Sequence, residues 1–224
     1  MQNFTIKKAG IIFGLVVLLL IALEMISGII GERTSFRNQA RFSIARSWTG
    51  EQKIIGPILV IPYTQTVKST SWNKETKEEV IHTRQVHRKM FVMPEELEIN
   101  SHANTEMRSR GMYQVPVYTA QLHVRGRFNN KPLLSRFNEN KDIVDIGQPY
   151  LSVLITDIRG IPSRPDLLWN QEETTFRSGS QLNGAPKGMH AVLPDLETGS
   201  EKNYPFSFDL ALRGMENLAF APLG

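Results

Sequence analysis

The side chains of this sequence that are best suited to chemistry belong to one carboxylate–arginine pair and five histidines. Asp157 and Arg159 stand two positions apart on one face of a predicted strand, and a catalytic acid is one role for such a carboxylate. A structural ion pair beside a turn is the simpler interpretation, and we favour it. A hydrolase would require Asp157 to lie beside a histidine in a cleft. No spacing typical of metal ligands is found among His82, His87, His102, His123 and His190.

The sequence contains no motif that builds a phosphate, zinc or nucleophile site. Gly179 and Gly184 have the spacing of a phosphate loop, but Ala185 follows where that loop needs Lys and then Ser or Thr. A G-x-S-x-G nucleophile elbow and an H-E-x-x-H zinc motif are both absent from the sequence. We therefore predict no catalytic residues, no cofactor and no metal, and a protein that acts through interactions.

The composition excludes further classes of site. The chain has 224 residues, a net charge of +4 and no cysteine, so the sequence offers neither a disulfide framework nor a thiolate metal site. No stripe rich in arginine and aromatic residues indicates nucleic-acid binding. The expected partners are instead the lipid bilayer, which the apolar stretch below indicates, and other transmembrane helices or envelope proteins, which the family resemblance below implies.

The element that organises the chain is the apolar stretch Ala9–Gly31, whose one charged residue is Glu24. About 20 apolar residues cross a ~30 Å hydrocarbon core, so this length predicts a transmembrane helix. A cleaved signal peptide is the alternative, because Lys7 and Lys8 precede the apolar core. However, Glu24 and Met25 stand where a signal peptide needs small residues, which favours an uncleaved anchor.

One face of this helix differs from the rest. At ~100° per residue, Gly10, Gly14, Glu24, Gly28 and Gly31 fall on the same side. Small residues let another helix approach closely, so these positions are candidates for membrane-helix packing, although glycine is also common in membrane helices. A carboxylate inside a membrane is a functional candidate, but Glu24 is also near enough to the helix end to reach the interface.

Residues 32–48 continue as an amphipathic juxtamembrane helix. Phe36, Ala40, Ile44 and Trp48 recur at every fourth position and form an apolar stripe. This stripe either packs on the domain that follows, which we favour, or lies in the membrane interface with Trp48 as an anchor.

Arginines cluster directly after the apolar stretch, at Arg33, Arg37, Arg41 and Arg46. Their charge suits anionic lipid headgroups. Taken literally, the positive-inside rule would keep the following domain in the cytoplasm, but long domains translocate largely regardless of such charges. The charges therefore do not decide the orientation.

The segment 50–224 has the pattern of a β-rich domain. Apolar and polar residues alternate with a period of two at 118–125 and again at 204–213, which predicts half-buried strands. The apolar run 58–61 between prolines predicts a buried strand. No regular alternation of strands with helices is present, so we predict a mainly β fold, either sandwich-like or an open antiparallel sheet.

Shorter segments are assigned from composition. We expect a solvated hairpin tip at Lys68–Glu79, one short helix within Asn129–Gly147, a strand at Tyr150–Ile158 and a long loop at Pro162–Lys187. The last residues, 218–224, suggest a strand without its neighbour, so we suspect a piece of a longer protein. The domain prediction is a leader at 1–8, a transmembrane helix at 9–31, a juxtamembrane helix at 32–48 and an incomplete β-rich domain at 50–224, whose periplasmic side is implied by the family resemblance that follows.

Several stretches spread along the chain are specific enough to suggest a family. They include Glu32-Arg33, Ser43 through Trp48, Gln52, Gly56 through Val60, Arg108 through Tyr113, Val115 through Tyr118, Asp157 through Ile161, Gly188 through His190, Leu212 through Gly214, and Ala221 through Gly224. In these stretches the chain resembles the CreD family of bacterial inner membrane proteins, also called cell envelope integrity or colicin-tolerance proteins.

The resemblance implies a large periplasmic domain after an N-terminal span, followed by further membrane helices, and this chain ends about halfway along that pattern. It carries no established reaction that named residues would perform. The expected function is a role in envelope integrity and stress response through interactions. A membrane-tethered module that binds a periplasmic ligand or protein is the alternative.

Overall fold

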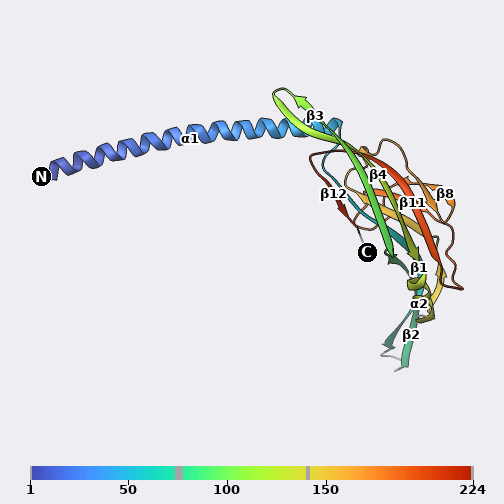
Figure 1. Ribbon diagram of the computed structural model, residues 1–224. Coiled ribbons are helices and arrows are strands. Elements are labelled where there is room, and N and C mark those ends of the chain that lie inside the picture. Colours follow the sequence, from blue (N-terminus) through green and yellow to red (C-terminus); the bar gives the residue numbers. More distant parts are fainter. Residues whose placement is uncertain (1, 74–77, 140–141, 223–224) are drawn as a thin grey trace. The chain divides into compact units, whose positions relative to one another are not determined.

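A long helix opens the chain. The computed structural model describes residues 2–73, 78–139 and 142–222, and its helix α1 runs without interruption from Gln2 to Ser47 (Figure 1). The predicted leader, transmembrane helix and juxtamembrane helix therefore form one continuous element. Within the described residues this is the one helix that is long and apolar enough to cross a membrane. Its large apolar side chains between Ile12 and Ile30 are exposed.

The described chain divides into two compact units. The first combines α1 with the tip of a β hairpin, and the second contains the rest of the β structure. The first unit comprises Met1–Ser47 and Arg108–Val115, and the second comprises Trp48–Met107 and Pro116–Gly224.

One sheet of the β structure has seven strands in the order β12-β1-β6-β10-β9, with β2 and β5 also paired to β1. The neighbours pair antiparallel except β12, which runs parallel to β1 and forms an edge of the sheet. The strands are β1 (Gln52–Asn73), β2 (Glu78–Val92), β5 (Ile143–Ile146), β6 (Tyr150–Ile155), β9 (Arg177–Ser178), β10 (Gly188–Val192) and β12 (Leu218–Ala221).

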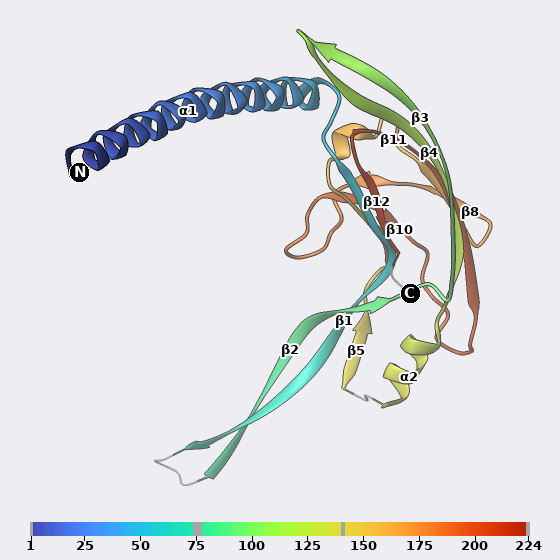
Figure 2. The same cartoon turned by 60° about the vertical axis from the view of Figure 1, so that its left-hand side comes forward.

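The second sheet has five strands in the order β3-β4-β11-β7-β8. Strands β4 and β11 form its centre, with an antiparallel register from Asn203 opposite Asn129 to Met215 opposite Val117 (Figure 2). The strands are β3 (Glu96–Arg110), β4 (Tyr113–Asn129), β7 (Asp166–Trp169), β8 (Glu172–Thr175) and β11 (Asn203–Met215).

The two sheets share one hydrophobic core. Leu59 and Leu151 of the seven-stranded sheet belong to the same buried cluster as Leu122 and Phe206 of the five-stranded sheet. Aromatic rings fill one part of this core, where Trp169 lies 5.8 Å from Phe128 and 5.7 Å from Tyr204 between ring centroids. Such rings contribute both buried area and preferred pair geometries to the core. The fold is thus mainly β with two open, largely antiparallel sheets, as predicted.

Alternation predicted the long strands correctly. The inward residues of β4, from Tyr118 to Val124, and those of β11, from Phe206 to Leu212, are all buried. The short helix is also confirmed as α2 (Lys131–Glu139), with Leu133 buried against the core.

The expected long loop at Pro162–Lys187 is wrong, because it contains β7, β8 and β9. These strands are only two to four residues long. They form because β7 pairs with β11 and β8, and β9 pairs with β10, and such pairing cannot be predicted from a local sequence pattern. The expected hairpin tip at Lys68–Glu79 is too wide, since β1 continues to Asn73 and β2 begins at Glu78. Residues 74–77 lie outside the described chain.

Candidate functional site

The predicted packing residues lie on α1. Gly14, Gly28 and Gly31 are exposed, and a Cβ atom placed on any of them would meet no neighbouring atom within 4 Å. Gly10 has a helical backbone, but its surroundings lie outside the described side chains. The glycine face of α1 is therefore open along its described length.

Glu24 lies on the same helix and is exposed among apolar side chains such as Leu23 and Met25. An ionised carboxylate in this setting either reaches the membrane interface or meets a polar partner from another helix.

The first residues after α1 enter a group of contacts that we call the junction cluster, formed by Trp48, Thr49, Gln52, Tyr118, Asp157, Gly160, Arg213 and Gly214. Trp48 donates its indole N–H to the Gly214 carbonyl at 3.1 Å, and the Thr49 hydroxyl donates to the Arg213 carbonyl at 2.7 Å. The Arg213 guanidinium also lies 5.3 Å from the centre of the Trp48 ring, within the range of cation–π attraction. The segment after the helix is thereby attached to the end of β11.

Gln52 links both sheets within this cluster and is only 1% exposed. Its amide nitrogen donates to the carbonyls of Asp157 at 3.1 Å and Arg213 at 3.2 Å, and its amide oxygen accepts from the Asp157 N–H at 3.2 Å. A Cβ at Gly160 would lie 2.5 Å from the Arg213 carbonyl oxygen and 2.7 Å from the Gln52 amide nitrogen. Only glycine allows this close approach.

Tyr118 closes the cluster on the side of β4. Its hydroxyl donates to the Asn217 carbonyl at 2.8 Å, and burial raises the pKa of Tyr118 to about 12. A Cβ at Gly214 would lie 2.2 Å from the Tyr118 hydroxyl oxygen, so this position also requires glycine. The tyrosine is held neutral as a structural hydrogen-bond donor.

The Asp157–Arg159 pair is an ion pair, with Arg159 Nη2 2.5 Å and Nε 3.0 Å from the two carboxylate oxygens. The hydrogen bond from Arg159 holds the pKa of Asp157 below its usual value, and the Asp157 carboxylate raises that of Arg159. The prediction that the two residues share one strand face is wrong, because Asp157 caps the short 3-10 helix η1 (Ile158–Gly160).

The charges that act on the Asp157 carboxylate in the described chain come from Arg159 and Lys187, and none comes from a histidine. The arrangement required for a hydrolase is therefore not found among the described residues.

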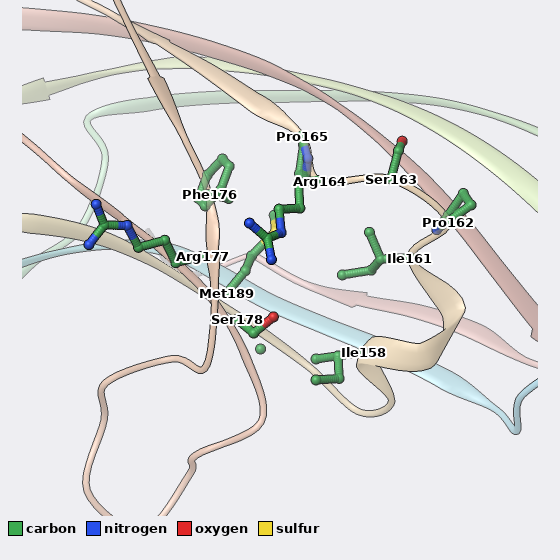
Figure 3. A pocket seen from close by; sticks show the side chains of 11 residues that line it. Ile158, Ile161, Pro162, Ser163, Arg164, Pro165, Phe176, Arg177, Ser178 and Met189 are labelled. Carbon is green, nitrogen blue, oxygen red and sulfur yellow. The ribbon is translucent and has the colours of Figure 1, made fainter.

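A small surface pocket of about 220 Å³ lies beside η1 (Figure 3). Phe176 and Met189 of its lining are buried, and the Arg177 side chain extends away from the other labelled side chains. Ser163 and Ser178 supply hydroxyls, but the described lining contains no histidine or carboxylate to activate them. The pocket is also smaller than the ~300–1,000 Å³ usual for ligand sites.

A larger groove of about 740 Å³ lies where β1, β2 and β5 meet. Phe91 is half exposed in it, and the Thr64 hydroxyl lies 3.0 Å from His87 Nδ1. Lys89 Nζ donates to the Gln181 carbonyl at 2.7 Å. The groove combines an apolar surface with the cationic side chains Arg88 and Lys89 and the carboxylate of Asp145, which is a lining of the kind that holds small ligands.

Within the described residues, no group of three or more His, Cys, Asp or Glu side chains is placed to hold a metal ion. Four of the five histidines instead contact ordinary hydrogen-bonding partners, which are Ser71 for His82, Thr64 for His87, Asp209 for His123 and the Gly179 carbonyl for His190.

Sequence reasoning treated Trp48, Asp157 and the stretch Leu212 through Gly214 one by one and missed that they meet. Gln52 and Arg213 are separated by 161 positions, so periodicity could not connect them. The one available signal was that these residues carry the family resemblance. The contacts of Trp48 support packing on the β domain and not the role of a membrane anchor.

Comparison with known proteins gives a consistent result. The sequence profile of a family described as "Inner membrane protein CreD" matches residues 4–224. A relative from Escherichia coli K12, described as "Inner membrane protein CreD", is 30% identical over 222 residues, which is 97% of this chain and 46% of the relative. The chain thus spans about half the length of that curated relative. No solved structure matches.

Proposed function

Because this chain belongs to the CreD family of inner membrane proteins, we propose that it is a membrane-anchored interaction module of the bacterial cell envelope. In this proposal α1 spans the inner membrane and the β domain faces the periplasm. The module contributes to envelope integrity and stress response through contacts with lipid, membrane helices and envelope proteins, and not through catalysis.

The observation that carries this proposal is the exposed apolar surface of α1. The stretch Ala9–Gly31 is about 34 Å long at 1.5 Å per residue, which exceeds a ~30 Å hydrocarbon core. Its leucines and isoleucines are more than half exposed from Leu18 to Leu23. Burying one such side chain is worth roughly 1.5–3 kcal/mol, so this surface is stable only in lipid or against other helices.

The open glycine face supports helix partners in particular. A helix that contacts only lipid has no need of small residues along one side. A neighbouring helix, in contrast, could pack closely against Gly14 and Gly28, where an added Cβ atom would meet nothing. Glu24 lies on the same face and would then have a place to meet a polar group.

The test is the orientation of the β domain. The chain has no cysteine, so a single Ser69→Cys change provides one exposed label site on β1. Asn129 is unsuitable as a label site, because it is 5% exposed and hydrogen-bonded to Glu201 and Asn203. Intact cells are treated with a maleimide that crosses the outer but not the inner membrane.

We expect Ser69→Cys to react in intact cells and an Asn3→Cys control, placed before the apolar stretch, to react only after lysis. The reverse pattern would place the β domain in the cytoplasm and refute the periplasmic role. Labelling of both positions in intact cells would show that α1 does not span.

The groove beside Phe91 favours the second candidate function, a tethered module that binds a periplasmic ligand. Its charge predicts that Lys89→Gln weakens such binding. A module that works through helix contacts alone would tolerate this change, and so the phenotype of Lys89→Gln in cells discriminates the two functions.

A further inference from the structure

The tip of the β3/β4 hairpin forms one compact unit with α1 (Figure 2). Tyr113, which opens β4, donates its hydroxyl to the Arg33 carbonyl at 3.3 Å. Arg33 is two residues beyond Gly31, which is about 3 Å along the helix axis. The tip therefore lies beside the turn of α1 at which the apolar stretch ends.

This level corresponds to the lipid headgroups if Ala9–Gly31 spans the membrane. A bilayer has a ~30 Å core and is ~40–45 Å thick with its headgroups, so each headgroup layer is roughly 5–8 Å deep. A tip that contacts the helix about 3 Å past the apolar stretch would lie inside that layer. The inference thus rests on the span in the proposed function.

The chemistry of the unit matches this location. Residues 32–47 and 108–115 together carry six arginines and one acidic residue, Glu32. Arg33, Arg37 and Arg110 are exposed. At the turn, Met112 is 87% exposed, although nothing polar in its side chain favours water. A projecting apolar residue surrounded by arginines is the pattern of a surface that inserts between anionic headgroups.

The turn geometry keeps Met112 at the extreme end of the hairpin. Gly111 adopts a φ of +61°, which a residue with a side chain rarely adopts, and this allows the tight connection from Arg110 to Tyr113. The two strands then hold the turn in place, and the Tyr113 hydrogen bond fixes its level on the helix.

We propose that the β3/β4 tip is a second membrane attachment, in which Met112 enters the boundary between headgroups and acyl chains. Arg33, Arg37 and Arg110 bind the phosphates of anionic phospholipids. Together with α1, this contact gives the protein two points of attachment in one leaflet and selects anionic lipid at the base of the helix.

The test uses a nitroxide spin label on single cysteines in the full chain, reconstituted in vesicles of phosphatidylcholine with phosphatidylglycerol. Met112→Cys reports the tip, and Gln114→Cys provides a second reporter in case the first alters the turn. Ser101→Cys is the matched control on β3, nine residues before Arg110 and thus about 30 Å away along an extended strand. Ile29→Cys reports the span itself.

We expect the label at Met112 to be accessible to oxygen and shielded from a water-soluble relaxation agent, and the label at Ser101 to behave as in water. Replacing Arg33 or Arg110 by Gln should lower the ratio of membrane-inserted to water-exposed tip by about fivefold for each arginine removed. Omitting phosphatidylglycerol should shift this ratio in the same direction.

An aqueous signal at both Met112 and Gln114 would overturn the inference. The label at Ile29 then separates the two failures. If it is in hydrocarbon, the span stands and only the tip contact is refuted, whereas an aqueous label at Ile29 refutes the span as well.

Discussion

The hydroxyl of Tyr118 is the single ionisable group in the junction cluster whose state follows from burial. Its pKa is raised to about 12 from the usual 10 because the charged phenolate would be desolvated. In the unfolded chain the tyrosine loses its proton near pH 10, whereas in the folded chain it keeps the proton. The unfolded state thus binds fewer protons above pH 10, and the free energy of unfolding falls as the pH rises.

We therefore expect the free energy of unfolding to decrease by roughly 2 kcal/mol between pH 10 and pH 12 through this group. Tyr118→Phe should remove that part of the pH dependence and cost ~1 kcal/mol at neutral pH through the lost bond to Asn217. Urea titrations of tryptophan fluorescence at several pH values measure both effects. Identical pH profiles for the two proteins would contradict the assignment.

Gly214 is a second residue of the junction cluster at which a substitution should change the stability of the β domain. A Cβ there would lie 2.2 Å from the Tyr118 hydroxyl oxygen and 2.9 Å from Gln52 Cγ, both in buried side chains. We expect Gly214→Ala to destabilise the β domain by about 1–3 kcal/mol through overpacking. Gly50→Ala is the matched control, since a Cβ at Gly50 meets nothing within 4 Å. Equal urea midpoints for the two variants would show that the cluster can relax around the extra methyl group.

At the scale of the element, α1 combines two surfaces in one helix. Its segment from Ile12 to Ile30 exposes large apolar side chains, and its C-terminal part buries Ala40 and Ile44 while Phe36 is half exposed. Two of the four positions of the predicted stripe are therefore buried. One helix therefore carries both the candidate span and a segment that packs on protein.

The glycine face provides the prediction for this element. We expect Gly14→Leu to weaken the association of α1 with a neighbouring membrane helix by about fivefold or more. The added side chain would keep the two helix backbones apart. Ala22→Leu is the matched control, since position 22 lies outside the glycine face. A photoreactive residue at Met25, at the edge of that face, reports the yield of cross-linked adducts in membranes. Equal yields in both variants would mean that the glycines serve no packing role.

At the scale of the whole molecule, the β structure has its own core. The buried cluster draws on both sheets within Trp48–Met107 and Pro116–Gly224. We expect the segment 48–224, expressed without α1, to show the circular dichroism of β structure and one cooperative thermal transition. Trp169→Ala should lower that transition, because it removes a buried aromatic side chain worth roughly 3–5 kcal/mol. An unfolded or aggregated segment would show that the β domain depends on the membrane unit.

The features that could be predicted from the amino-acid sequence are those that depend on residues close together in the chain. A long apolar run predicts the exposed α1 helix because the run consists of residues that are adjacent in the sequence and can be recognised without knowing their partners. A period of two predicts β4 and β11 because each strand has one face in the core. The same logic identified the Asp157–Arg159 pair, whose partners are two residues apart.

The features that became visible in the folded chain alone depend on residues that are far apart in the sequence. The short strands β7, β8 and β9 are held by pairing, so composition made them resemble a loop. The junction cluster joins Gln52 to Arg213, and the hairpin tip meets Arg33 through Tyr113, across 161 and 80 positions of sequence. Such contacts form because the folded chain offers a buried carbonyl or an open turn at the required place, and no local pattern encodes where those groups will be.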